Sequence, residues 1–130
     1  MSTERINEAK LPPSMHQPAA YAGPSREKVL ALRQQYVSPG LIQYYRDPLM
    51  IVEGHMQYVY DETGKRYLDA FAGIVTISVG HCHPSITERV QEQVGKLQHT
   101  TTIYLHPAIA QMAEKLAEKL PDRITQSYFT

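Results

Sequence analysis

The sequence has 130 residues, of which 42% are apolar and 20% charged, a composition typical of one globular domain at most. Its 13 Lys and Arg residues balance 13 Asp and Glu residues, and this zero net charge argues against a nucleic-acid partner. The single cysteine excludes an internal disulfide, and the apolar stretches are too short to cross a membrane, so a soluble protein without membrane contact is expected.

Residues 1–24 are rich in Pro, Ala, Ser and Gln and show no apolar period. This composition predicts a flexible arm without a core of its own, either disordered or laid on a partner. Glu4 and Glu8 argue against an acid-poor transit peptide, and the stretch lacks the apolar segment of a secretory signal. We therefore expect a cytoplasmic protein.

Residues 25–83 are predicted to form one helix and a small antiparallel meander. Ser25 is a suitable N-cap for a helix over 26–37. Residues 61–64 contain a glycine and predict a hairpin connection between the last two strands of the meander. The three β-prone runs cover 50–54, 57–61 and 65–71.

Residues 84–130 are predicted to form two helices and one strand. The helices cover 84–97 and 107–120, and each combines an apolar stripe with a proline at its first position. Residues 124–130 alternate between apolar and polar side chains as a strand does, but the sequence offers no second strand to pair with it. In open α/β proteins ligands bind beyond the carboxyl ends of strands, so the ligand site would lie beyond this strand. We therefore expect an incomplete domain of a larger enzyme.

Residues 80–84, Gly-His-Cys-His-Pro, allow two interpretations. His81, Cys82 and His83 could begin a metal site, but zinc needs at least a third, well-separated ligand, and the other histidines lack ligand spacing. The favoured interpretation is a helix-launching turn without a metal: the glycine permits a tight backbone, His81 hydrogen-bonds locally and His83 is the N-cap. Cys82 is expected to be a small buried thiol rather than a nucleophile.

The run from Tyr44 to Pro84 has a Gly-X-X-X-Tyr-X-X-Asp-X-X-Gly-X-X-Tyr-Leu-Asp spacing followed by Gly-His-X-His-Pro. It resembles the N-terminal region of class III (fold type I) pyridoxal-phosphate-dependent aminotransferases, most closely the alanine–glyoxylate type, and the resemblance covers about 25–130. It implies an α/β fold in which the meander belongs to a small domain and the helices lead into a large-domain sheet. It also implies transfer of an amino group from an amino acid to a 2-oxo acid, with pyridoxal 5'-phosphate as electron sink.

The resemblance implies that residues of this chain line the substrate pocket and take no direct part in the chemical steps. Gly73 and Ile74 correspond to a segment on the substrate side of the cofactor, and Tyr44 to an aromatic residue that reaches the same pocket. A second set corresponds to a segment near the subunit interface of a homodimer or dimer of dimers. It comprises Thr101, Thr102 and Tyr104.

The resemblance implies no catalytic residue in this chain, because the family's phosphate-binding turn and cofactor-binding lysine correspond to positions beyond Thr130. The chain alone is therefore expected to be inactive and not to bind the cofactor stably. Two alternatives remain: a class III phospho-lyase or decarboxylating relative, and, less favoured, a small His/Cys metal-binding module.

Overall fold

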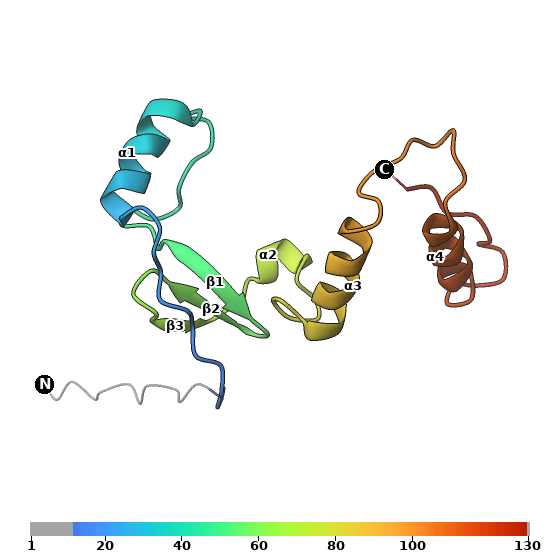
Figure 1. Cartoon of the computed structure of the whole chain (residues 1–130), viewed down its shortest axis with the longest axis horizontal. Helices are drawn as coiled ribbons and strands as arrows, with labels where there is room; N and C mark the ends of the chain where they lie inside the picture. The colour runs from blue at the N-terminus through green and yellow to red at the C-terminus, as the bar shows by residue number, and fades with distance from the viewer. Residues whose placement is uncertain (1–11, 130) are drawn as a thin grey trace, which may run out of the picture. The chain divides into compact units, whose positions relative to one another are not determined.

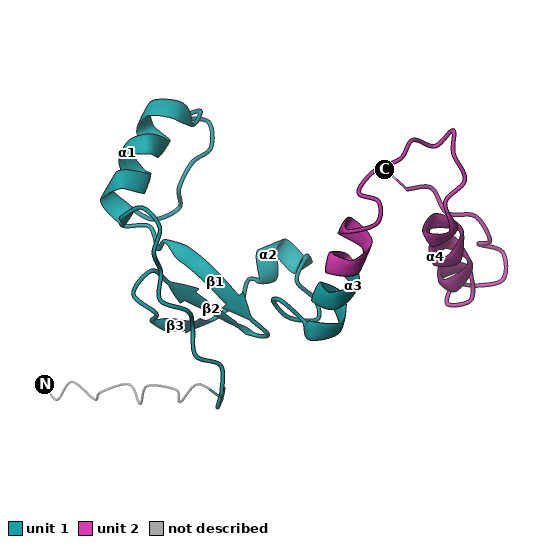
Figure 2. Cartoon of the chain, viewed as in Figure 1, with its two compact units in different colours: residues 1–89 teal, residues 90–130 magenta. Residues whose placement is uncertain are grey.

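The computed structural model describes residues 12–129, and the chain divides into two compact units, Met1–Arg89 and Val90–Thr130 (Figure 2). The division falls inside helix α3 (Pro84–Val94). The predicted domain boundary between residues 83 and 84 remains a prediction, because division by compactness does not identify the small and large domains of a longer protein.

Helix α1 (Arg26–Tyr36) begins at the predicted N-cap. Ser25 has an extended backbone, and its hydroxyl accepts the backbone N–H of Lys28 at 3.3 Å, which satisfies one of the unpaired donors of the first turn. Arg26 Nε donates to the carbonyl of Pro48 at 2.9 Å. This bond ties the start of the helix to the segment that enters the first strand.

Three short strands form the predicted meander (Figure 1). They are β1 (Ile51–His55), β2 (Tyr58–Asp61) and β3 (Arg66–Leu68), paired antiparallel in the order β1-β2-β3. The central strand carries the core: Tyr58 and Tyr60, at 1% and 2% exposure, are the buried hydrophobic side chains among residues 12–129. Alternate residues of a strand point to one face, so both rings lie on the same side of the sheet.

Asp61 organises the turn between β2 and β3. Its backbone carbonyl accepts the N–H of Gly64 at 2.9 Å, and Gly64 adopts a φ of 81°, which glycine permits without steric cost. Its carboxylate accepts the N–H and hydroxyl of Thr63, the N–H of Lys65 and the hydroxyl of Tyr67 at 2.7–3.0 Å. The predicted hairpin connection over 61–64 is confirmed.

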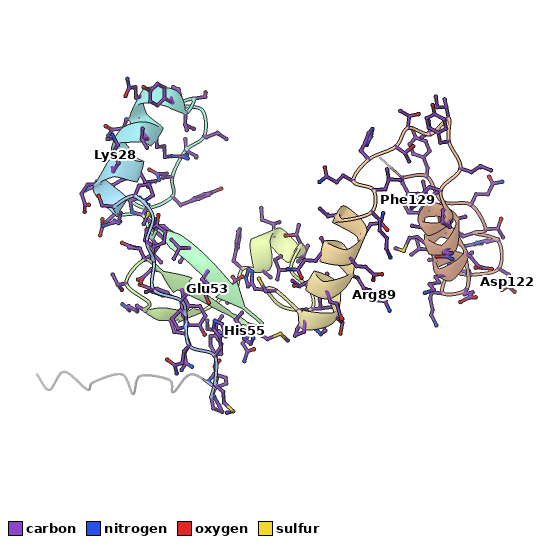
Figure 3. All side chains as sticks on the ribbon, viewed as in Figure 1. Lys28, Glu53, His55, Arg89, Asp122 and Phe129 are labelled. Carbon is purple, nitrogen blue, oxygen red and sulfur yellow. The ribbon has the colours of Figure 1, made fainter. Side chains whose placement is uncertain are left out.

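The described part of the predicted arm lies on β1 (Figure 3). The imidazole of His16 stacks on that of His55, with ring centroids 4.2 Å apart and planes 4° from parallel. Glu53 holds the arm at two points: one carboxylate oxygen lies 2.5 Å from His16 Nε2, and the other accepts the N–H of Ala19 at 2.9 Å. Residues 1–11 of the predicted arm lie outside the described residues.

The two predicted His-Pro helices are confirmed as α3 and α4 (Pro107–Ala117), although they end at 94 and 117 rather than at 97 and 120. Gly95 follows α3 directly, where the low helix propensity of glycine favours termination. The strand predicted over 124–130 is wrong for its described part, since residues 124–129 are in neither strand nor helix. The alternating pattern meets no partner, because all three described strands pair only with one another.

Candidate functional site

The strongest local feature is a left-handed turn, α2 (Ala72–Val75), which contains the predicted pocket residues Gly73 and Ile74. All four residues have positive φ, with values of 50° at Ala72, 57° at Gly73, 59° at Ile74 and 61° at Val75. Only glycine adopts this region freely, and each other residue costs about 1–2 kcal/mol there. Such a turn persists only where surrounding contacts hold it, a situation common at functional sites.

Asp69 supplies the first of these contacts. One carboxylate oxygen, Oδ1, accepts the backbone N–H groups of Phe71 and Ala72, both at 2.9 Å, and so fixes the entry into the turn. The exit is closed by Thr76, whose hydroxyl donates to the carbonyl of Gly73 at 2.8 Å. The turn is therefore held at both ends by side chains that bond to backbone.

His81 completes the network from a segment that follows the turn. Its Nε2 lies 2.7 Å from Oδ2 of Asp69, and the two side chains are only 22% and 15% exposed. The carboxylate can only accept, so Nε2 of His81 carries the proton. The hydrogen bond lowers the pKa of Asp69 from its ordinary value, with further lowering by the N–H groups of Ala72 and Phe71, which keeps the carboxylate charged.

The backbone around His81 is fixed independently of its side chain. Its N–H and carbonyl form a two-bond bridge with Met56 at 2.7 and 2.8 Å. Its ring rests against Gly54, where a Cβ would come within 2.8 Å of His81 Cγ. Gly80 has a φ of 105°, and a Cβ there would lie 2.9 Å from Met56 Cα. The two glycines thus permit the close approach of this segment to the sheet.

A hollow of about 260 Å³ adjoins the Asp69–His81 pair. It is lined by Met56, Gln57, Asp69, Ala72, Ile77, Ser78, Val79, Gly80 and His81. The lining combines apolar walls with one half-buried, hydrogen-bonded polar pair, which is the usual make-up of a small-molecule pocket. Sequence reasoning predicted a local bond for His81 but did not identify Asp69, although Asp69 ends the Tyr-Leu-Asp motif itself.

The predicted pocket residues are only partly brought together. Gly73 and Ile74 lie in the left-handed turn, and Ile74 is 72% exposed, but only Ala72 of that turn lines the hollow beside His81. Tyr44 lies in the segment between α1 and β1 and is 89% exposed, and it does not line the hollow beside His81. Its role as a pocket residue stays a prediction.

The second predicted set lies in residues 90–130. Thr101, Thr102 and Tyr104 line a hollow of about 440 Å³ at the start of α4, together with Leu105 and His106. Its lining is largely apolar and threonine-rich. Whether it faces a partner subunit stays a prediction.

The Gly-His-Cys-His-Pro stretch forms the predicted turn into α3. The carbonyl of His83 accepts the N–H groups of Ile86 and Thr87 at 3.0 and 2.9 Å, as an N-cap residue does. The expectation of a buried thiol is wrong, because Cys82 is exposed. Cys82 has a φ of 49°, at a turn where the neighbouring His81 rather than the thiol packs on the sheet. Within residues 12–129 no three His, Cys, Asp or Glu side chains group as metal ligands would.

The model of the class-III aminotransferases matches residues 42–130, which include the turn, the Asp69–His81 pair and both predicted sets of pocket residues. The chain belongs to the class-III aminotransferase family. A mitochondrial alanine–glyoxylate aminotransferase 2 homologue of Arabidopsis thaliana is 49% identical over 95% of this chain and 26% of its own length. The human mitochondrial alanine–glyoxylate aminotransferase 2 is 42% identical over 87% of this chain and 22% of its own length.

Solved structures of the family agree with the fold. A structure of ornithine aminotransferase from Toxoplasma gondii, which contains pyridoxal phosphate at partial occupancy, is 29% identical with a TM-score of 0.62. The match covers 73% of this chain and 21% of that one. The predicted α/β class, with a small antiparallel meander followed by helices, is thereby confirmed. This class-III chain spans about a quarter of the length of the curated relatives it matches.

The predicted cytoplasmic location is contradicted by the relatives of this class-III chain. Both alanine–glyoxylate relatives named above are mitochondrial proteins. The prediction used Glu4 and Glu8, which lie outside the described residues, and a lone cysteine. A lone cysteine argues against a disulfide-rich secreted protein and does not distinguish one reducing compartment from another. Separately, no helix among residues 12–129 has the length and apolarity that a membrane crossing requires.

Pyridoxal phosphate is the cofactor that the class-III family implies, and the described residues do not form a site for it. The lining of the hollow beside Asp69 and His81 contains no lysine to bond the cofactor and no arginine to hold its phosphate. Of the described lysines, Lys96, which lies just beyond α3, pairs with Glu92 at the surface, and Lys65 lies over the ring of Tyr67. We therefore assign no step through the cofactor to these residues.

Proposed function

We propose that this chain is the N-terminal part of a pyridoxal-phosphate-dependent aminotransferase that moves an amino group from an amino acid to a 2-oxo acid. The main support is the family match over residues 42–130, which includes the whole of the Gly-X-X-X-Tyr to Gly-His-X-His-Pro pattern. In such enzymes the cofactor is the electron sink, and the protein orients the substrate around it. The residues of this chain would orient and enclose, since the lining beside Asp69 and His81 lacks a lysine.

Alanine and glyoxylate are the proposed substrate pair. The relatives of 49% and 42% identity carry that activity in their names, whereas the solved structure cited above is an ornithine aminotransferase at 29%. The test is a coupled assay on the complete product of the gene, with alanine or ornithine as donor and glyoxylate or 2-oxoglutarate as acceptor. Alanine-dependent conversion of glyoxylate to glycine is expected. Turnover with ornithine but not with alanine would refute the proposed substrate pair. A protein that turns over neither donor would refute the proposed aminotransferase activity.

Gly73, Ile74 and Tyr44 are proposed as walls of the substrate pocket. The support for the first two is their position in a strained turn that the half-buried Asp69–His81 pair holds. Replacing Ile74 with Ala in the complete protein should raise the KM for the amino donor with little change in kcat. Ile51 of β1, which is exposed and does not line the hollow, provides a matched control, and an equal effect of Ile51→Ala would contradict a specific wall at Ile74.

A homodimer or dimer of dimers is proposed for the complete protein, with Thr101, Thr102 and Tyr104 near the interface. Its support is the exposed apolar run beside them, since Ile103 is 81% exposed and Leu105 fully exposed. Large exposed apolar side chains on neighbouring residues are typical of a surface that a partner covers. Light scattering should give a dimeric or tetrameric mass, and Leu105→Asp should lower it. A monomeric mass would contradict the assembly.

The isolated 130-residue chain is not expected to bind pyridoxal phosphate stably. We expect the 130-residue chain to show no absorbance band of bound pyridoxal phosphate, because neither of the two described hollows is lined by a lysine that could bond the cofactor. A saturable band in the isolated chain, lost on mutation of a single lysine, would contradict this expectation.

A further inference from the structure

The left-handed turn Ala72–Val75 requires an external clamp. Three of its four residues are not glycine, and their positive φ values are unfavourable for any residue with a Cβ. Backbone bonds also span the segment: the N–H of Ile74 reaches the carbonyl of Phe71 at 3.1 Å, and the N–H groups of Thr76 and Ile77 reach the carbonyl of Ala72, the latter at 3.0 Å. The remaining entry bonds come from the side chain of Asp69.

Asp69 can hold the turn only while its own carboxylate is held. Oδ1 is occupied by the N–H groups of Phe71 and Ala72, and the second oxygen, Oδ2, faces His81 Nε2 at 2.7 Å. Hydrogen bonds to an ionised acceptor are roughly twice as strong as neutral ones, so this contact fixes the rotation of the carboxylate. His81 is the one partner that reaches Oδ2 among the contacts of the described residues.

His81 is in turn anchored to the sheet rather than to the turn. Its backbone bridges Met56, and its ring rests on Gly54 of β1. The order of support thus runs from sheet to His81, from His81 to Asp69, and from Asp69 to Ala72. A rigid element therefore fixes a strained segment through two side chains, as preorganised sites require.

We propose that Asp69 and His81 are a pair of positioning residues that transmits the rigidity of the β1–β2 sheet to the left-handed turn, and so sets the wall of the substrate pocket. The first part of the proposal, that the pair holds the left-handed turn rigid, follows from the hydrogen bonds of Asp69 and His81. The second part, that the turn sets the wall of the substrate pocket, rests on the proposed function. Neither side chain is a catalytic residue in this proposal, because each acts through the backbone of residues 71–75.

Amide hydrogen exchange of the complete gene product tests the first part, the link from His81 to the turn, and this measurement needs no enzyme activity. His81→Leu removes the bond to Oδ2, and the amides of Phe71 and Ala72 should then exchange about tenfold faster. His81→Gln retains a side-chain N–H donor and should restore slow exchange. His99→Leu, at an exposed histidine of residues 90–130, is the matched control and should change neither amide.

The amide of Met56 reports separately on whether the variant keeps its fold, since it bonds to the carbonyl of His81 rather than to the ring. Fast exchange at Phe71 and Ala72 with slow exchange at Met56 supports the positioning pair. If His81→Leu also speeds exchange at Met56, then Asp69→Ala, which keeps His81, must show fast exchange at Phe71 and Ala72 with slow exchange at Met56. Unchanged exchange at Phe71 and Ala72 in both variants, or loss at Met56 in both, would overturn the proposal.

Steady-state kinetics of the complete gene product test the second part. His81→Leu should raise the KM for the amino donor about tenfold while kcat falls less than about threefold, and His81→Gln should return KM close to the original value. An unmodified protein that turns over no donor refutes the proposed function and leaves the exchange result standing. An active protein in which His81→Leu frees the turn without raising KM refutes the link to the substrate pocket alone.

Discussion

At the scale of single residues, Asp61 has the densest set of hydrogen bonds in the described chain. Burial raises the pKa of its carboxyl, but hydrogen bonds from Thr63, Tyr67 and Lys65 outweigh it and lower the pKa from 3.8 to about 2. The folded state therefore binds a proton less readily than the unfolded state. The stabilisation is complete above pH 3.8 and is lost as the pH falls through about 2.

Replacing Asp61 with Ala should destabilise the β2–β3 hairpin by about 1–3 kcal/mol, because the buried carboxylate accepts four hydrogen bonds and bonds to a charged group contribute most. Amide exchange at Lys65 measures this locally, and its protection factor, the intrinsic rate divided by the observed rate, should also fall in the unmodified chain as the pH drops below 3.8. Glu62→Ala, one position along the chain, is the control and should leave Lys65 slow. Equal exchange in Asp61→Ala and Glu62→Ala would contradict the role of Asp61.

The turn at Asp61 and the turn at Gly73 differ in how far the sequence predicts them. Asp-Glu-Thr-Gly carries its own turn chemistry, since an aspartate bonds to backbone two residues ahead and a glycine supplies the positive φ. Gly73 indicates one positive φ at most, whereas Ile74 and Val75 are β-branched and disfavour that region. Their conformation depends on Asp69 and His81, 12 positions apart in sequence, and no local pattern predicts that contact.

At the scale of elements, α4 depends on an unusual cap. Nδ1 of His106 accepts the N–H of Ala108 at 3.2 Å, and Pro107 occupies the first helical position. His106→Ala should cost about 1 kcal/mol of helix stability, which corresponds to roughly fivefold faster exchange of the Ala108 amide. His106→Asn supplies a good N-cap and should retain slow exchange. Equal rates in the two variants would contradict the capping role.

The arm forms a second, separable element because Glu53 holds it at two points. The hydrogen bond with His16, and next the N–H of Ala19, lower the pKa of Glu53 from 4.5. The attachment is thus present above the ordinary pKa of 4.5 and is lost as the pH falls through the lowered value. Glu53→Ala should expose residues 12–19 to limited proteolysis at neutral pH, whereas Glu62→Ala should not. Resistance in both variants would show that other contacts hold the arm.

Strands and helices were predicted with different success because they need different partners. Helices α3 and α4 satisfy their backbone bonds internally, so a proline and an apolar stripe sufficed to place their starts, although not their ends. The meander was predicted because each strand has its neighbour close in sequence. Residues 124–129 carry the same alternation, yet a strand has no structure without pairing, and among the described residues none pairs with them.

At the scale of the whole molecule, the apolar stripes of α3 and α4 lack cover. Ile86, Val90 and Val94 are 49–55% exposed, and Ile109 and Met112 are 50% and 49% exposed. Single exposed apolar residues are ordinary, but an aligned stripe on an amphipathic helix normally packs on a neighbouring element. The chain spans only 26% of the Arabidopsis relative, so the relative has ample additional sequence for such cover.

The isolated chain should therefore bind a hydrophobic dye and self-associate at micromolar concentration. Val90→Lys in α3 together with Met112→Lys in α4 should reduce both effects at least about threefold, because each places a charge within a stripe. Gln91→Lys with Gln111→Lys is the matched control: it adds the same charge to the same helices at exposed polar positions, and should leave dye binding unchanged. Equal loss in both pairs would mean that net charge, rather than the stripes, governs association. A sharp cooperative melt of a monomer without dye binding would show instead that the stripes are covered within the chain itself.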